Sequence, residues 1–134
     1  MAGSPQVNFL KKCLTISKWA GISAPRVCFE TGTYRGDGAL TLMEYFTTVH
    51  TIELSEKWYR HSSERLASVK GIVCHHGDSA EVLAGLLPQL REPVAFFLDA
   101  HFAGGDTARG REEVPLLREL ETICNRQYAD LLIV

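Results

Sequence analysis

The chain has 134 residues, in which 14 Lys and Arg face 16 Asp and Glu, so the net charge is −2. Apolar residues make up 46% of the chain and charged residues 22%, a composition typical of globular proteins that excludes intrinsic disorder. The near-neutral charge offers no electrostatic attraction to nucleic acid or an anionic membrane, and no apolar run approaches the roughly 18–20 residues of a membrane span. Residues 1–134 suffice for one hydrophobic core, so we expect a single domain.

The N-terminal segment and the cysteines indicate a cytoplasmic protein. The segment before residue 20 lacks the basic, apolar and small-residue regions of a secretory signal peptide. Cys13, Cys28, Cys74 and Cys124 lie far apart in apolar stretches, and none forms a CxxC pair. This pattern predicts buried, reduced thiols rather than disulfides or a zinc site.

The first elements follow from the spacing of apolar residues. Helical spacing predicts an N-terminal helix over residues 5–20, and the core of the domain extends over 27–134. A first strand is predicted over 27–31. A glycine-bearing turn then leads into a helix over 39–46.

The middle of the chain continues this alternation. The β-branched run over 49–53 predicts a second strand. Ser55 is placed to cap the helix that follows, which extends to about residue 69. A third strand is predicted over 72–75.

The remaining elements repeat the pattern to the end of the sequence. Ser79 is placed to cap a helix that ends near residue 90. The apolar run over 93–98 predicts a fourth strand that is covered on both faces. A helix over 111–126 and a fifth strand over 130–134 follow.

Alternating strands and helices predict a parallel α/β sheet, because each connection is long enough for a crossover helix. The spacing of Leu117, Leu120 and Cys124 supports the last of these helices. Right-handed crossovers give a Rossmann-like, doubly wound sheet with strand order 3-2-1-4-5 and helices on both faces. Ligands bind such sheets outside the carboxyl ends of the strands.

Polar and small residues crowd those predicted strand ends. Gly32 begins the turn after the first strand, where free N–H groups at a helix start favour an anionic ligand group. Glu53 lies 21 positions later, at the tip of the second strand. That spacing is typical of an acid that accepts hydrogen bonds from ribose hydroxyls. The two features together predict a site for an adenosine-containing ligand.

The acidic character of the turn distinguishes between such ligands. Dinucleotide-binding turns have the pattern GxGxxG, whose second glycine lets the backbone approach the pyrophosphate. Tyr34 occupies that position here, and Glu30 and Asp37 would repel a pyrophosphate. A ligand with a cationic centre suits these residues better.

Four motifs resemble those of the class I S-adenosylmethionine-dependent methyltransferases. Residues 30–36 are similar to the E-x-G-x-x-x-G form of that family's first motif, and Glu53 matches the acid that ends the second strand. Residues 77–79 resemble the third motif, and residues 97–101 resemble the motif of the fourth strand. The resemblance implies S-adenosylmethionine as cofactor, bound by Glu30, Gly32, Thr33, Tyr34, Gly36, Glu53, Asp78, Ser79 and Asp99.

The resemblance implies methyl transfer to a small-molecule acceptor, with a hydroxyl as one candidate group. Asp99 and His101 are the candidate catalytic residues, because a hydroxyl must lose its proton and both follow the fourth strand. Asp106 could join them as a metal ligand, since some related O-methyltransferases use a metal. Three ligands on one loop make a poor metal site, so we expect none.

Two other functions fit the same fold: an NAD-binding oxidoreductase and a non-catalytic domain that binds adenosine or another protein. The sequence has no Tyr-x-x-x-Lys pair, which argues against the oxidoreductase. Asp78 is equally suited to cap the helix that follows it. His101 is equally suited to hydrogen-bond its own loop.

The last predicted strand leads to an expectation about partners. The strands that the family has after its fifth are absent from this sequence, so the resemblance implies a domain cut short there. We expect the uncovered apolar strand over 130–134 to favour self-association. We expect no nucleic-acid or membrane partner.

Overall fold

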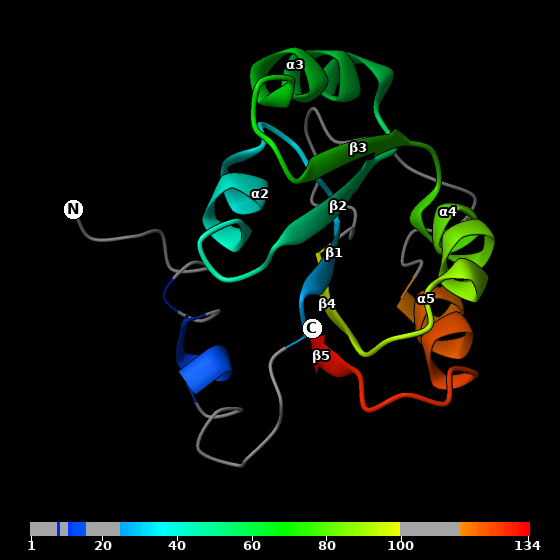
Figure 1. The fold of residues 1–134 in the computed structure, drawn as a ribbon. Helices are drawn as coiled ribbons and strands as arrows, with labels where there is room; N and C mark the ends of the chain where they lie inside the picture. Colours follow the sequence, from blue (N-terminus) through cyan, green and yellow to red (C-terminus); the bar gives the residue numbers. More distant parts are fainter. Residues whose placement is uncertain (1–7, 9–10, 16–24, 100–115) are drawn as a thin grey trace.

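A five-stranded parallel sheet forms the centre of the molecule (Figure 1). The computed structural model describes residues 8, 11–15, 25–99 and 116–134, and the structural statements below concern these residues. The strand order is β3-β2-β1-β4-β5, which confirms the predicted order. The strands are β1 Val27–Thr31, β2 Thr48–Glu53, β3 Ile72–His76, β4 Val94–Leu98 and β5 Leu131–Ile133.

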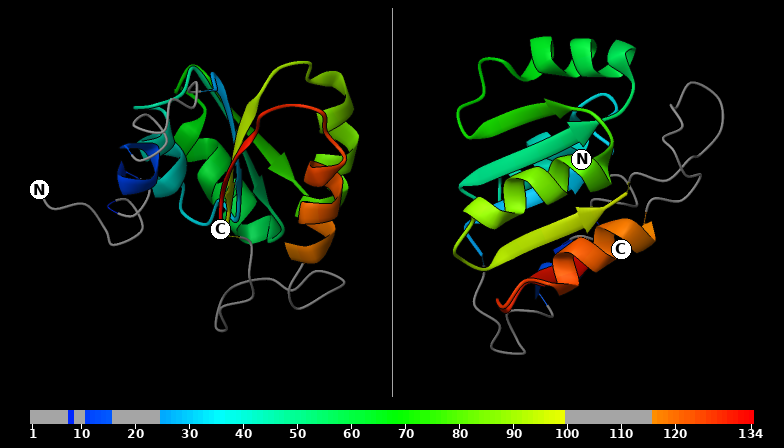
Figure 2. Two further views of the ribbon diagram at one scale, coloured as in Figure 1. Left: turned by 90° about the horizontal axis from the view of Figure 1, so that it is seen from below. Right: turned by 90° about the vertical axis from the view of Figure 1, so that its right-hand side faces the viewer.

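Helices cover both faces of the sheet, as the sequence predicts (Figures 1 and 2). One face carries α2 Asp37–Leu42 and α3 Glu56–Leu66; the other carries α4 Ser79–Leu86, the 3-10 helix η1 Leu87–Gln89 and α5 Leu116–Cys124. Residues 8 and 11–15 are also helical. The rest of the N-terminal helix predicted over 5–20 lies outside the described residues.

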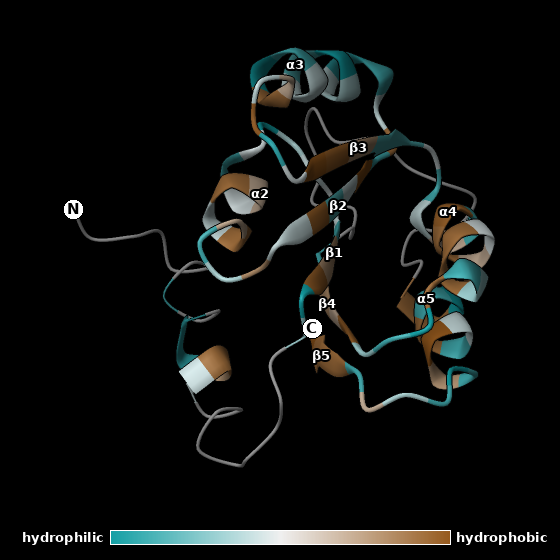
Figure 3. Ribbon diagram, viewed as in Figure 1, coloured by the Kyte–Doolittle hydropathy of each residue, from teal (hydrophilic) through white to brown (hydrophobic). Residues whose placement is uncertain are grey.

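An apolar cluster lies on each face of the sheet. The first cluster contains Cys28, Ala39, Leu42, Phe46, Val49, Leu66, Ala95 and Ile133. The second contains Phe29, Ile52, Leu83, Leu87, Val94, Phe96, Leu98 and Ile123. Figure 3 shows this distribution, with hydrophobic strands at the centre and a largely hydrophilic α3 at the surface. Burying each large apolar side chain contributes about 1.5–3 kcal/mol, so these clusters fix the positions of the strand ends.

β1 occupies the middle of the sheet, and its carboxyl end is flanked by those of β2 and β4. Thr31 pairs with Ile52 on one side and with Leu98 on the other. Residues that follow these strands therefore meet at one edge of the sheet. The chain reverses its direction of winding between β1 and β4, which makes this edge the place where such sheets bind ligands.

The first residues of α2 and α3 are set by the residues that cap these helices. Ser55 is confirmed as the N-cap of α3, because its hydroxyl accepts a hydrogen bond from the N–H of Trp58 at 3.4 Å. The helix predicted over 39–46 is α2, which begins two residues earlier and ends at Leu42. Its N-cap is Gly36 with a φ of 92°, a backbone conformation that glycine adopts without strain.

α4 differs from its prediction at both ends. Ser79 is not its cap: the Asp78 carboxylate accepts hydrogen bonds from the N–H groups of Ala80 and Glu81 at 3.0 and 3.3 Å. The helix was expected to continue to about residue 90, but it gives way to η1 at Leu87. Pro88 lies in η1, and its missing N–H ends the α-helical ladder.

α5 buries a different face from the predicted one. Leu117, expected on the apolar side, is 76% exposed, and Cys124 is exposed as well. Glu119 and Ile123 are buried in their place. The expectation that all four thiols are buried is therefore wrong for Cys124, although it holds for Cys28.

No described helix is both long enough and apolar enough to cross a membrane.

Candidate functional site

The turn after β1 is held against the end of β2 by its backbone. The N–H groups of Gly32 and Thr33 both donate to the carbonyl oxygen of Ile52, at 2.8 and 3.2 Å. Gly32, Tyr34 and Gly36 have φ angles of 88°, 50° and 92°, so the chain passes through the left-handed region three times within five residues. Glycine relieves the strain at two of these positions, and Tyr34 retains it.

Glu53 links this turn to the start of α3. One carboxylate oxygen accepts a hydrogen bond from the N–H of Tyr34 at 2.8 Å, and the other accepts one from the N–H of Ser55 at 2.8 Å. The side chain is 8% exposed. A carboxylate oxygen accepts more than one hydrogen bond, so Glu53 keeps acceptor capacity for a ligand while it holds the turn in place.

Glu30 lies buried beneath α2, where hydroxyl groups connect it to the turn. The Thr51 hydroxyl donates to the Glu30 carboxyl group at 2.7 Å. Because that hydroxyl has one proton, the Thr33 hydroxyl 2.6 Å away must be the donor to Thr51. A Cβ at Gly38 would lie only 2.1 Å from Glu30 Oε1, so α2 approaches this acid through a glycine.

The buried position of Glu30 raises its pKa from 4.5 to about 8. Burial is the largest cause, and the negative charges of Asp99 and Glu53 act in the same direction, whereas the hydrogen bond from Thr51 opposes them. Glu30 is therefore mostly protonated at neutral pH in the isolated site. A cation bound among these three acids would favour its ionised form.

Asp99 follows β4 and is tied to the end of β1. Its N–H lies 3.0 Å from the Thr31 hydroxyl oxygen and 3.2 Å from the Thr31 carbonyl oxygen, and both accept from it. Its side chain is exposed at the strand-end edge. The other candidate catalytic residue, His101, lies outside the described residues, as does Asp106.

Aromatic and cationic side chains border the turn on the α3 side. The Tyr34 ring packs 4.4 Å from that of Trp58, and the Arg35 guanidinium lies 5.2 Å from the Tyr34 ring. Asp37 is exposed and pairs with Arg65 of α3 at 2.7 Å. The Asp37 charge is thus balanced at the surface, and Glu30 contributes the buried acid of the turn.

Asp78 and Ser79 both contact residues of α5, which the sequence analysis did not predict. The Ser79 hydroxyl donates a hydrogen bond to the carboxylate of Glu119, which is fully buried. Arg118 lies 3.9 Å from Asp78, which is also the α4 cap. The sequence offered one sign of this contact: Glu119 falls on the same helical face as the apolar residues at 116, 120 and 123.

The adjacent histidines of β3 point to opposite faces, as strand geometry requires. His75 Nε2 lies 2.9 Å from His50 Nδ1, and the His50 ring stacks on Phe29. His76 stacks on Tyr59 of α3 instead. Burial, followed by the nearby His75, lowers the pKa of His50 to about 4. His50 and His75 therefore lie within the sheet, whereas His76 ends β3 in register with Glu53.

Within the described ranges, no group of three or more His, Cys, Asp or Glu side chains could hold a metal ion. The acidic set at the strand ends fits an organic cation bound through hydrogen bonds and charge. Glu53 and Asp99 supply negative charge, and Glu30 adds to it once a bound cation favours its ionised form. The glycines of the turn leave space for a ligand close to the backbone.

No protein-family model matches this chain, and no curated protein matches it. Solved structures do match. The O-methyltransferase TomG from Streptomyces achromogenes, in complex with S-adenosylmethionine, is 21% identical with a TM-score of 0.58. An O-methyltransferase from Bacillus cereus, in complex with S-adenosylhomocysteine, is 23% identical with a TM-score of 0.57. The chain has the Rossmann-like fold of S-adenosylmethionine-dependent methyltransferases.

The extent of these matches differs between relatives. The match with TomG covers 75% of this chain and that with the Bacillus protein covers 74%, and each covers only 46% of the other chain. The chain thus spans about half the length of these two enzymes. The SMU.1697c protein of Streptococcus mutans, in complex with S-adenosylhomocysteine, is 13% identical with a TM-score of 0.59; the match covers 94% of this chain and 68% of that one.

Proposed function

We propose that the protein binds S-adenosylmethionine and takes part in methyl transfer to a small-molecule acceptor that carries a hydroxyl group. The observation that carries this proposal is the set of three acids, Glu30, Glu53 and Asp99, at the carboxyl ends of β1, β2 and β4. Negative charge at the switch point of a methyltransferase-type sheet suits a ligand that is cationic at its sulfonium and ammonium groups. The two O-methyltransferases with this fold support a hydroxyl as the acceptor.

The proposed contacts follow from the position of each residue. The turn after β1 lies beside the methionine part of the cofactor, through Gly32, Thr33, Tyr34 and Gly36. The remaining lone pairs of the Glu53 carboxylate accept hydrogen bonds from the ribose hydroxyls. Asp78 and Ser79, at the start of α4, lie beside the adenine. Asp99 supplies negative charge near the cationic groups, and Glu30 adds to it when the bound cation favours its ionised form.

The reaction requires alignment more than acid–base chemistry. The cofactor supplies a methyl group on a sulfonium with a good leaving group already present, so the protein chiefly orients two molecules and excludes water. A hydroxyl acceptor must also lose a proton. Asp99 is exposed at the strand-end edge and is the described residue best placed to accept it, and His101 is the second candidate for that role.

An NAD-binding oxidoreductase is the main alternative on a sheet of this kind. Tyr34 stands where dinucleotide-binding turns have their second glycine, and its N–H is committed to Glu53. Glu53 and Asp99 place negative charge at the same edge of the sheet. These features oppose a pyrophosphate, which brings negative charge to the turn.

Calorimetric titration of the chain with S-adenosylhomocysteine and, separately, with NAD⁺ tests the proposal. We expect saturable binding of S-adenosylhomocysteine only, weakened about tenfold or more by Glu53→Gln, because each hydrogen bond to a charged group contributes about 1.5–3 kcal/mol. Glu56→Gln, an exposed acid on α3, is the matched control and should leave binding unchanged. Binding of NAD⁺ alone would support the oxidoreductase, and binding of neither would support an interaction domain.

The edge of the sheet at β5 supports a second, separate proposal about partners. In the described part of the chain β5 pairs with β4 alone, and Leu132 and Val134 are 40% and 57% exposed. We propose self-association through residues 130–134, since an open apolar edge favours pairing with another strand. Sedimentation velocity should show dimers that Leu132→Lys reduces. A monomer at all concentrations would contradict this proposal.

A further inference from the structure

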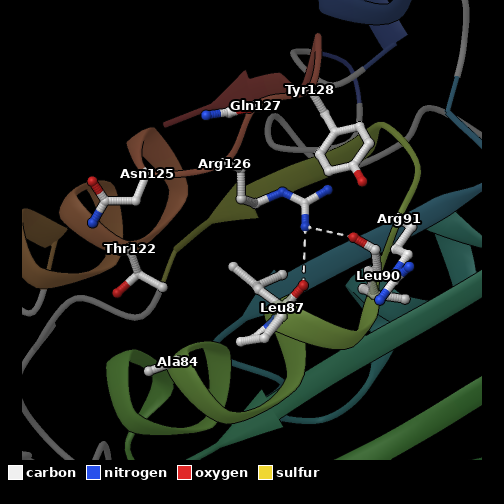
Figure 4. Close-up of a pocket in the computed structure, with 10 residues that line it drawn as sticks. Ala84, Leu87, Leu90, Arg91, Thr122, Asn125, Arg126, Gln127 and Tyr128 are labelled. Carbon is white, nitrogen blue, oxygen red and sulfur yellow. Dashed lines mark hydrogen bonds between the residues drawn. The ribbon is translucent and has the colours of Figure 1, made fainter.

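Figure 4 shows a cavity lined by residues of 84–91 and 122–128, at the opposite end of the sheet from the acidic residues. It has a volume of about 610 Å³, within the roughly 300–1,000 Å³ typical of small-molecule pockets. Its walls come from the end of α4, from η1 and from the segment between α5 and β5. These segments precede β4 and β5, so the cavity lies at the amino ends of the strands, away from Glu53 and Asp99.

Arg126 holds the two walls of this cavity together. Its guanidinium group pairs with Asp130 at 2.8 Å, and both side chains are more than 90% buried. Its remaining N–H groups donate to backbone carbonyl oxygens before β4, those of Leu87, Leu90 and Glu92, at 3.2, 3.1 and 2.6 Å. The walls are therefore fixed in the absence of a ligand. Arg126 itself has no N–H left for one, since five donors meet five acceptor contacts.

The lining combines an apolar floor with one unbalanced positive charge. Ala84, Leu87 and Leu90 form the apolar side, and the Tyr128 ring, 40% exposed, lies 4.8 Å from the Arg126 guanidinium group (Figure 4). Arg91 lies at the rim, is exposed, and forms no ion pair with another described residue. Because the Arg126 charge is neutralised by its partner, Arg91 determines the sign of the charge that the cavity attracts.

Polar groups on the opposite wall add hydrogen-bonding capacity. Thr122 and Asn125 come from α5 and the residue after it, and Gln127 follows in the same segment (Figure 4). Side-chain amides and hydroxyls both donate and accept, so they suit a carboxylate and its hydration shell equally. The arrangement of an apolar floor, a cation and neutral polar groups matches an amphiphilic anion.

We propose that this cavity binds a small carboxylate that carries an apolar or aromatic body. The apolar body packs on Ala84 and Leu87 beside the Tyr128 ring, and the carboxylate pairs with Arg91. The proposal does not depend on the proposed methyl transfer, because no residue of the acidic site lines this cavity. A ligand here contacts α5, the helix whose Glu119 holds Ser79 at the other end of the sheet.

The test compares phenylacetate with 2-phenylethanol, a neutral molecule of nearly the same shape, in ¹⁵N NMR titrations of the 134-residue chain. We expect saturable shifts of the amides over 125–128 with phenylacetate and about tenfold weaker binding of the alcohol. Arg91→Gln, at an exposed position, should remove that preference and leave the alcohol's affinity unchanged. Arg60→Gln, on α3, is the matched control that should retain it.

Filling the cavity provides the second variant. Ala84→Phe should abolish binding of both compounds while the spectrum keeps its dispersion. Absence of saturable shifts at 125–128 in the wild-type chain would overturn the proposal. A carboxylate preference that survives Arg91→Gln would overturn it as well, because the charge at the rim would then have no part in binding.

Discussion

Replacing Glu30 by Gln should stabilise the fold, and the gain should grow with pH. The substitution keeps the shape of the side chain and its acceptor oxygen for the Thr51 hydroxyl, but it removes the ability to ionise. Glu30 has a pKa of about 8 in the folded chain, where burial and two neighbouring acids disfavour its charge, against an ordinary value of 4.5. Between pH 4.5 and pH 8, therefore, Glu30 keeps its proton in the folded chain and loses it in the unfolded chain.

The sign and size of the effect follow from this difference. Wild-type stability should fall as pH rises from 4.5 to 8, because the unfolded chain gains the free energy of ionisation that the folded chain resists. The difference between the two pKa values of Glu30 corresponds to a destabilisation of the folded wild-type chain by about 5 kcal/mol at high pH. About 1 kcal/mol of this destabilisation is present at pH 5 and about 4 kcal/mol at pH 8. Glu30→Gln should therefore gain about 3–4 kcal/mol over wild type between pH 5 and pH 8.

Urea unfolding followed by circular dichroism at pH 5, 7 and 8 measures this gain directly. The control is Glu56→Gln, because Glu56 is exposed and its ion pair with Arg60 lies at the surface. That variant should follow the wild-type pH dependence. If Glu30→Gln and wild type instead show parallel stability curves over this range, Glu30 ionises normally and the buried-acid description of the site is wrong.

Two substitutions and one titration test other parts of the structure. Gly38→Ala places a Cβ 2.1 Å from Glu30 Oε1, so urea unfolding should show a loss of about 1–3 kcal/mol, and an unchanged stability would contradict the close packing of α2. Arg126→Met leaves the buried Asp130 without its partner and should cost about 3–5 kcal/mol, measured in the same way; a loss under 1 kcal/mol would refute its bridging role. NMR titration of His50 should show a midpoint near pH 4, so stability falls as pH drops from 6.5 toward 4, whereas a midpoint near 6.5 would contradict its burial.

The sheet was predictable because its signals are local and repeated. Each strand is a short apolar run bounded by polar or glycine-rich turns, and right-handed crossovers leave few possible strand orders. Once the order is known, Glu30, Glu53 and Asp99 must meet at one edge, since the carboxyl ends of neighbouring parallel strands lie together. The fold, and the meeting of these three acids at one edge, therefore follow from the sequence.

The side-chain arrangement around α4 and α5 was not predictable in the same way. A spacing of three and four residues fits more than one helical face, and the sequence alone favoured the face containing Leu117, which is exposed. The buried face of α5 is the one that contains Glu119, whose carboxylate contacts Ser79, 40 positions away in the sequence. That contact also draws Ser79 away from capping and leaves the cap to Asp78, the residue for which the sequence left both roles open.

The protonation of Glu30 was likewise beyond the sequence. An acid at the end of a strand reads as a charged ligand group, and nothing in the local pattern shows that α2 covers it through Gly38. Burial and the neighbouring acids come from tertiary structure, and they convert this residue into a neutral group at pH 7. Its charge state, and hence its response to a cationic ligand, could be read only from the folded chain.

A ¹⁵N NMR titration of the 134-residue chain with S-adenosylhomocysteine tests the central claim most directly. The proposed site predicts saturable shifts of the backbone amides of Gly32, Thr33, Tyr34 and Ser55, because the first two donate to β2 and the last two donate to Glu53. The amides over 125–128, at the other end of the sheet, should stay in place. Saturable shifts confined to those distant amides, or no saturable shifts at all, would contradict a cofactor site at the acidic strand ends.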